Sequence, residues 1–204
     1  MTPKEARDLC ILAHAGQFRR DRLMTKEELK YANANITRDD IPVGMGFEFM
    51  LPNGNKLINC MDNYTIAEPY HTHPLAVADM LDTDEEKIVG YLHDVIEDTD
   101  AELVIINSGG FKEFAINFHG KDYFISAIAW DAIQVLTKTA DIKNYTFYIN
   151  KITTLHYFDL ELMPAQELAV KVKLVDMFHN MSTSDSNRQK QKYLSAIPTL
   201  LKAL

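Results

Sequence analysis

The sequence YLHDVIEDTD, at residues 91–100, decides how this chain is interpreted. On a helix, His93 and Glu97 lie one turn apart on the same face. Asp94 and Asp98 repeat that spacing one residue further along. A solvated helix end with an incidental histidine is the alternative, but several acids near a helix C-terminus oppose its macrodipole. Because carboxylates this close repel one another, the stretch predicts a bound cation.

A second stretch, LAVKVKLVDMFHNMST at residues 168–183, predicts an apolar helix with one carboxylate in its middle. That carboxylate, Asp176, lies between Val175 and Met177, and Asn180 follows one turn later. Burial of an unpaired carboxylate is costly, so Asp176 needs a cation or several hydrogen-bond donors. The stretch alone leaves open whether that partner is a metal or a group within the core.

A third stretch, HTHP at residues 71–74, precedes another expected helix. Isolated histidines usually have structural roles, so this pair is a weak signal by itself. Combined with the other two stretches, it gives a nitrogen and oxygen ligand set without thiolate, which suits Mn²⁺, Fe²⁺, Co²⁺ or Zn²⁺ better than Ca²⁺ or Mg²⁺. The candidate ligands are His73, His93, Asp94 and Asp176.

Helical spacing of apolar residues dominates the rest of the chain. Asn-Gly at residues 53–54, between two apolar runs, predicts a β-hairpin over residues 44–60. We therefore expect a mostly α fold with a small β-hairpin insertion, in a single domain over residues 1–204 whose insertion covers about 21–70. The expected helices are 3–16, 25–34, 73–81, 84–97, 111–118, 122–138, 145–156, 164–181 and 187–203.

Composition narrows the classes of function. The 204 residues contain 47% hydrophobic residues, which is ordinary for a globular protein, and no stretch approaches the roughly 20 apolar residues of a membrane span. Only two cysteines are present and the N-terminal residues do not resemble a signal peptide, so we expect a cytoplasmic protein. A net charge of −8 argues against nucleic acid as a partner, but not against a small anionic substrate.

In this order, the motifs resemble the HD superfamily of metal-dependent phosphohydrolases. Within it, the pattern is similar to the hydrolase domains of RelA/SpoT-type (p)ppGpp enzymes and to stand-alone small alarmone hydrolases. Glu-Asp-Thr after His-Asp favours this branch over HD nucleotidases in general. The matching patches cover most of the chain: AHAGQFRRD at 13–21, His-Pro at 73–74, HDVIEDT at 93–99, LTK at 136–138, the run from 145 to 152, and KLVDMFHNM at 173–181.

The resemblance implies an HD-domain helical fold and a Mn²⁺ ion, with Fe²⁺, Co²⁺ or Zn²⁺ as alternatives. It places the metal on His73, His93, Asp94 and Asp176. It assigns water activation and proton transfer to Glu97 and Asp98. It assigns substrate binding to Arg19 and Arg20, near the phosphates or the base, and to Asn180 and Thr183, beside the nucleoside.

The chain departs from that pattern in three places. The stretch between Arg20 and His73 is longer than in compact members, and residues 100–135 are hard to align. The usual Ala-Asp-Arg of the last motif reads Val175-Asp176-Met177. These departures alter segments of the expected substrate pocket and leave the four candidate metal ligands in place.

We therefore expect an enzyme that removes the 3′-pyrophosphate of (p)ppGpp or a related alarmone. Within its 204 residues there is no room for a synthetase domain, so the expected activity is hydrolysis only. Another nucleotide, such as NADPH or a deoxynucleotide, is the enzymatic alternative. A non-catalytic module that binds nucleotide or protein is the alternative of another class, and the presence of Glu97 with Asp98 favours an enzyme. The expected partner is a small anionic nucleotide, with no nucleic acid or membrane, and a homo-oligomer is left open.

Overall fold

The computed structural model describes residues 1–19, 22–23, 48–51, 54–60, 63–140, 142–154, 162–184 and 186–204. The chain divides into two compact units. The helical unit comprises residues Met1–His14 and His73–Leu204, and the inserted unit comprises Ala15–Thr72. The bounds of the inserted unit nearly coincide with those of the insertion expected at about 21–70. The expectation of a single domain stays a prediction.

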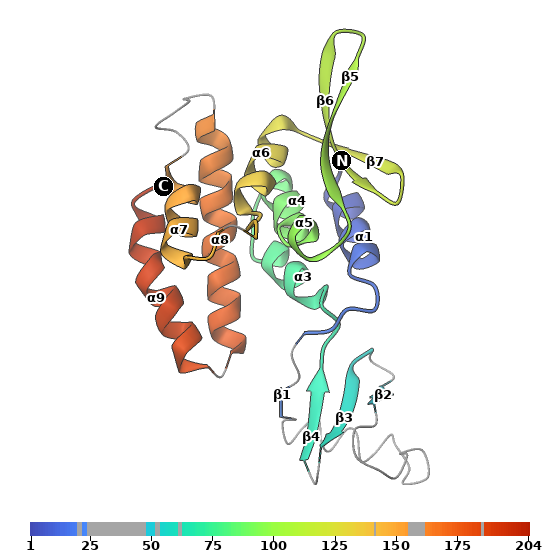
Figure 1. Cartoon of the computed structure of the whole chain (residues 1–204), viewed down its shortest axis with the longest axis vertical. Helices are drawn as coiled ribbons and strands as arrows, with labels where there is room; N and C mark the ends of the chain where they lie inside the picture. Colours follow the sequence, from blue (N-terminus) through green and yellow to red (C-terminus); the bar gives the residue numbers. More distant parts are fainter. Residues whose placement is uncertain are drawn as a thin grey trace. The chain divides into compact units, whose positions relative to one another are not determined.

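The fold is mostly α, as the sequence predicts (Figure 1). Helices at 3–16, 73–81, 145–156, 164–181 and 187–203 are confirmed within a few residues at their ends. The expected helix at 25–34 lies outside the described residues. The helices of the helical unit are α1 (Pro3–Ala13), α3 (Thr72–Asp79), α4 (Asp84–Leu92), α5 (Val95–Asp98), α6 (Ala127–Leu136), α7 (Tyr145–Thr153), α8 (Met163–Thr183) and α9 (Asn187–Leu201).

The expected helix at 84–97 is interrupted, and this prediction was wrong in its C-terminal part. Helix α4 ends at Leu92, and the short helix α5 begins at Val95. The imidazole Nδ1 of His93 lies 2.8 Å from the carbonyl oxygen of Gly90, where it competes with the backbone amide that would continue the helix. The break places His93 and Asp94 at a bend instead of within one straight helix.

The predicted helix at 111–118 is also wrong, because these residues form the middle strand of an antiparallel sheet. Its strands are β5 (Glu102–Ser108), β6 (Phe111–Phe118) and β7 (Lys121–Ile125), in the order β5-β6-β7. Phe114, Ile116 and Phe118 alternate along one face toward the core, which is a period of two. Both connections are two-residue turns with positive φ, at Gly109–Gly110 and at His119–Gly120, as in type I′ hairpins.

The same sheet corrects the expected helix at 122–138. Residues up to Ile125 belong to β7, and α6 begins only at Ala127. The Ser126 hydroxyl accepts the amide hydrogen of Ala129 at 3.0 Å, which is the N-cap that starts the helix.

The inserted unit contains a four-stranded antiparallel sheet in the order β1-β4-β3-β2. Strands β2 and β3 confirm the hairpin predicted at 44–60 in its described part, with Met50 opposite Lys56. The amide of Gly54 donates to the carbonyl of Leu51 at 2.9 Å, and Gly54 has a φ of +86°. The strands are β1 (Arg22–Leu23), β2 (Glu48–Met50), β3 (Lys56–Cys60) and β4 (Asn63–Ala67).

Close approach of α3 and α4 depends on Gly90. A Cβ atom at residue 90 would lie 2.7 Å from Leu81 Cδ1 and 3.0 Å from the backbone Cα of Ala78. Helix α4 is fixed to α8 by an ion pair between Glu86 Oε1 and Lys171 Nζ at 3.0 Å. None of the helices in the described part of the chain combines the length and apolar character that crossing a bilayer would require.

Candidate metal centre

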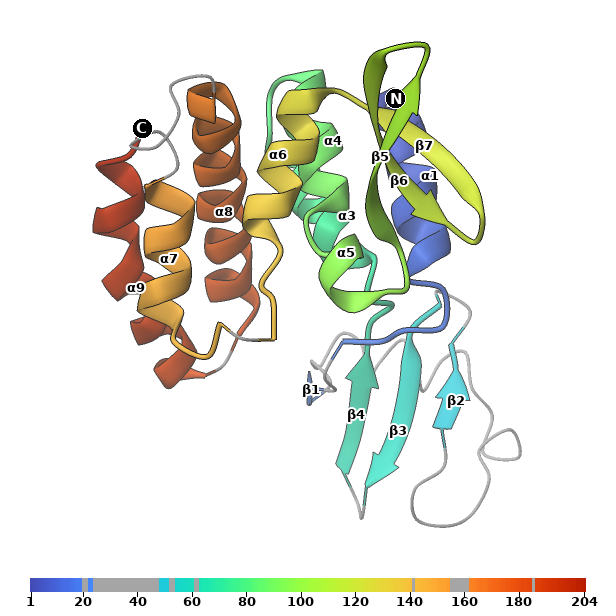
Figure 2. The ribbon, with the colours of Figure 1, turned by 45° about the horizontal axis from the view of Figure 1, so that its top comes forward.

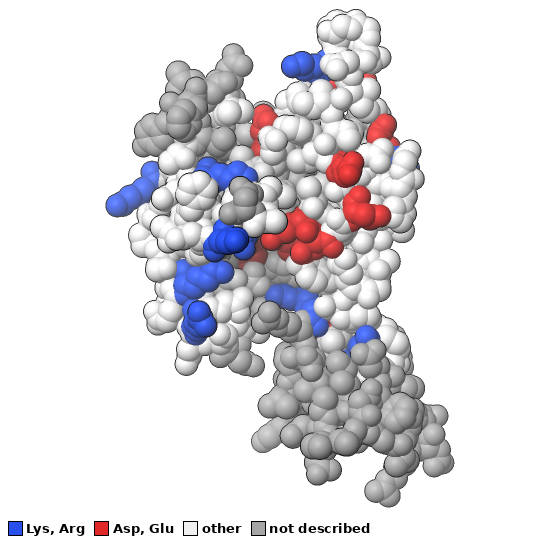
Figure 3. All heavy atoms as spheres, in the orientation of Figure 1, with Lys and Arg blue, Asp and Glu red and all other residues white. Residues whose placement is uncertain are grey.

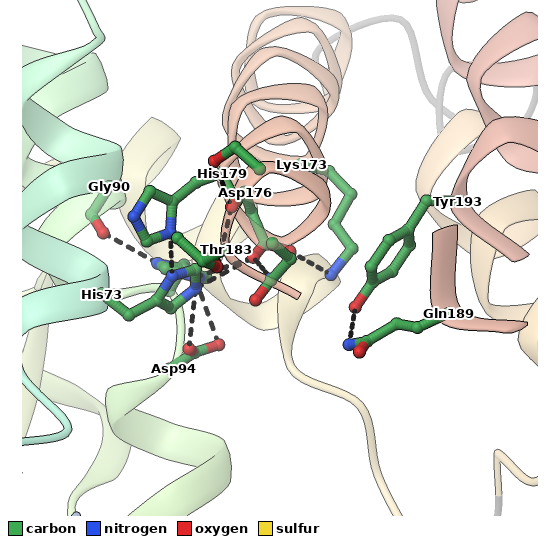
Figure 4. Close-up of polar contacts among 12 residues, drawn as sticks. His73, Gly90, Asp94, Lys173, Asp176, His179, Thr183, Gln189 and Tyr193 are labelled. Carbon is green, nitrogen blue, oxygen red and sulfur yellow. Dashed lines mark hydrogen bonds and ion pairs between the residues drawn. The ribbon is translucent and has the colours of Figure 1, made fainter. Parts of the chain in front are cut away.

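Two histidines and one aspartate from three distant segments meet inside the helical unit (Figure 4). His73 lies on α3, His93 at the bend after α4, and Asp176 on α8. One ligand atom from each lies within 4.8 Å of the others, and each residue is at most 4% exposed. This buried group could bind a metal ion.

The tautomer of His93 leaves a lone pair directed at this centre. Its Nδ1 donates to the Gly90 carbonyl oxygen, so Nε2 is the unprotonated nitrogen of the neutral ring. That Nε2 is buried and has no hydrogen-bond partner within the described part of the chain. A buried acceptor without a donor is costly, and a metal ion would satisfy it.

Asp176 is held as a carboxylate by its surroundings. Its Oδ1 lies 3.0 Å from His73 Nε2 and 3.9 Å from His93 Nε2, and its Oδ2 accepts from Lys173 Nζ at 2.7 Å. Burial opposes ionisation, but the Lys173 ammonium, with help from the imidazoles, outweighs it and holds the pKa of Asp176 well below its usual range. The anionic form that a metal ligand requires is therefore the stable one.

Asp94 lies at the same centre but is less enclosed than the three buried residues. Its carboxylate oxygens lie 3.2 Å from His93 Nε2 and 3.7 Å from His73 Nε2, and its side chain is 21% exposed. All four predicted ligands therefore come together. The three buried ones form the closest group.

Glu97 and Asp98, the predicted proton-transfer pair, lie on α5 next to these ligands. Glu97 Oε2 accepts the backbone N–H of Lys138 at 3.0 Å. Burial raises the pKa of Glu97, and the nearby charges of Asp94 and Asp98 raise it further. A carboxyl group with a raised pKa is better suited to exchange protons near neutral pH than an ordinary glutamate.

The predicted substrate-binding residues divide between the two units. Asn180 donates from Nδ2 to Asp176 Oδ1, so it belongs to the centre. Thr183 is exposed, and its hydroxyl donates to the His179 carbonyl within α8 at 3.0 Å. Arg19 belongs to the inserted unit, where its amide donates to the Glu68 carbonyl at 2.9 Å. Arg20 lies outside the described residues.

Two residues at the centre were not predicted as part of it. Lys173 is the cation beside Asp176, and its position three residues earlier on the same helix could have indicated the pair. His179 Nδ1 lies 2.7 Å from His73 Nδ1, a contact between α8 and α3 that local spacing does not reveal. With Nδ1 of His73 engaged there, its Nε2 faces Asp176.

The sequence matches no model of a known protein family, and no curated protein matches it.

Proposed function

We propose that this chain is a divalent-metal-dependent phosphohydrolase of the HD type. The substrate that its motifs favour is (p)ppGpp or a related alarmone, from which it would remove the 3′-pyrophosphate. The observation that supports the proposal most is the buried meeting of His73, His93 and Asp176, with the lone pair of His93 Nε2 left unsatisfied.

The ligand chemistry favours a borderline transition metal. Two imidazole nitrogens and carboxylate oxygens, with no thiolate, suit Mn²⁺, and also Fe²⁺, Co²⁺ or Zn²⁺. A divalent ion held there would polarise a phosphate group and supply hydroxide at neutral pH. Asp94, more exposed than the other three, would be the fourth ligand, on the side of the centre that solvent reaches.

The residues of the chain supply the remaining chemistry. Glu97 has a raised pKa and would accept a proton from the attacking water, and Asp98 would pass it onward. Asn180 and Lys173 hold Asp176 in one orientation from two directions, so the ligand needs little rearrangement during turnover. This arrangement favours an enzyme over a binding module, because binding alone does not require the pair on α5.

Metal removal tests the proposal directly. Treatment with EDTA should abolish release of pyrophosphate or phosphate from a nucleotide panel of (p)ppGpp, NADPH and deoxynucleoside triphosphates, and added Mn²⁺ should restore it. His93→Gln should lose activity and bound metal. His119→Gln is the matched control, since His119 is an exposed histidine paired with Asp100 on the surface. Full activity in EDTA, or no activity on any nucleotide with Mn²⁺, would contradict the proposal.

A further inference from the structure

Helices α7, α8 and α9 bring aromatic rings and lysines together beside the metal centre. Both ribbon views place these three helices side by side (Figures 1 and 2). The ring of Tyr145 lies 6.2 Å, between centroids, from those of Tyr148 and Tyr193. Lys192 Nζ lies 3.9 Å from the Tyr145 ring centroid, and Lys173 Nζ lies 5.1 Å from that of Tyr148.

Within this cluster, two groups lack the partner that their neighbours have. The Tyr148 hydroxyl donates to the Leu136 carbonyl, and the Tyr193 hydroxyl accepts from Gln189 Nε2 at 2.9 Å. The hydroxyl of Tyr145 is buried and has no hydrogen-bond partner in the described part of the chain. A buried hydroxyl without a partner is unfavourable, so the chain maintains it at a cost unless a ligand satisfies it.

The ammonium of Lys192 is the second such group. Lys173 is neutralised by Asp176, but among the described residues Lys192 has aromatic rings as neighbours and no carboxylate in ion-pair distance. Burial lowers the pKa of Lys192, and the nearby charges of Lys173 and Lys138 lower it further. The Lys192 ammonium therefore lies over the Tyr145 ring without a described carboxylate to neutralise it.

The distribution of charge agrees with this local excess. On the face drawn in Figure 3, Lys and Arg side chains gather over α7 and α9, whereas Asp and Glu lie over α5, α6 and the sheet. The chain as a whole carries a formal charge of −8, so this gathering of basic side chains over α7 and α9 differs from its average surface. Such a field raises the local concentration of small anions.

We propose that the Tyr145 hydroxyl and Lys192 form an anion subsite that binds a phosphate group of the substrate other than the one being hydrolysed. A phosphate offers several acceptor oxygens and a negative charge, which match one hydroxyl donor and one ammonium group. Burial keeps the pKa of the Tyr145 phenol above its ordinary value, so the hydroxyl remains a donor. This inference rests on the proposed function for the identity of the substrate, but not for the binding of phosphate itself.

The subsite can be tested without turnover, with inorganic pyrophosphate as the probe and calorimetry on the metal-stripped full chain. Tyr145→Phe removes only the hydroxyl that no described group bonds, so the melting temperature should stay the same while the Kd for pyrophosphate rises. Lys192→Gln should raise that Kd by about tenfold or more, as expected for loss of a charge-assisted hydrogen bond. Lys190→Gln is the control, because Lys190 lies two residues away on the opposite side of α9 and should leave Kd unchanged.

Unchanged pyrophosphate binding in both Tyr145→Phe and Lys192→Gln would overturn the subsite. An equal loss in Lys190→Gln would also overturn it, because the effect would then be one of overall charge. The subsite and the hydrolase proposal fail separately. Variant-sensitive pyrophosphate binding without hydrolysis of any nucleotide would support the subsite and contradict the function, whereas hydrolysis with an unchanged KM in both variants would do the opposite.

Discussion

The two sides of the candidate metal centre differ in charge. On one side, the segment from His93 to Asp98 carries three carboxylates and no lysine. On the other side, α8 and α9 contribute Lys173 and Lys192, and the candidate ligand Asp176 is already neutralised by Lys173. The difference teaches that the carboxylates have different surroundings: Asp176 is held by the Lys173 ammonium and the Asn180 amide, whereas burial and neighbouring acids raise the pKa of Glu97 on α5. The acidic side should therefore govern the rate of the chemical step, and the basic side should govern binding of the anion.

Removal of Asp176 should have the largest effect, because this residue serves both sides. Asp176→Ala should abolish metal binding and activity and leave the buried ammonium of Lys173 without its partner. Loss of one member of a buried ion pair typically costs about 3–5 kcal/mol of stability. Elemental analysis and urea denaturation measure the two effects. His93→Gln is the comparison, since it should lose metal while the Lys173–Asp176 pair stays intact, and equal destabilisation in both variants would remove the special role of that pair.

Changes on the acidic side should lower the rate without removing the metal. Glu97→Gln and Asp98→Ala should reduce kcat by about 10² to 10⁴-fold, the usual contribution of a general acid or base. Bound metal, measured on the same preparations, should remain near the level of the unmodified protein. If Asp98→Ala loses as much metal as Asp176→Ala, the division between ligands and proton-transfer groups is wrong.

Replacement of residues 44–60 by a short Gly/Ser linker should have the smallest effect. These residues belong to the inserted unit, and every candidate ligand belongs to the helical unit. Loop length itself costs little, about 0.6 kcal/mol per doubling. We expect a folded chain with its metal, in which KM for the preferred nucleotide changes more than kcat. An unfolded or metal-free product would show that the helical unit depends on this hairpin.

The sequence was sufficient where local pattern and local chemistry agree. Asp176, in the middle of an apolar helix, was expected to need a cation or several hydrogen-bond donors, and Lys173, Asn180 and His73 contact its carboxylate. The Asn-Gly turn predicted the hairpin of the inserted unit correctly. The order of the histidine and aspartate motifs predicted that His73, His93, Asp94 and Asp176 meet. His73 and Asp176 are 103 positions apart in the sequence.

The sequence was insufficient where two periodicities fit the same residues. In FKEFAINF the apolar residues at 111, 114 and 118 satisfy helical spacing, while 114, 116 and 118 satisfy the alternation of a strand. Pairing with β5 and β7 decides between them, and that pairing depends on turns at Gly109–Gly110 and His119–Gly120. The cluster around Tyr145 could not be predicted from the sequence for a different reason. It depends on how α7, α8 and α9 pack together, and no single segment contains its pattern.

Gly90 gives the molecule a vulnerability that its chemistry does not reveal. The residue has no side chain to contribute, yet its carbonyl oxygen orients His93 and its missing Cβ lets α4 approach α3, where His73 lies. The geometry of the site therefore depends on a residue that has no functional group of its own. Replacement of Gly90 even by alanine would keep every candidate ligand and still change the distance between α3 and α4, and with it the spacing of His73 and His93.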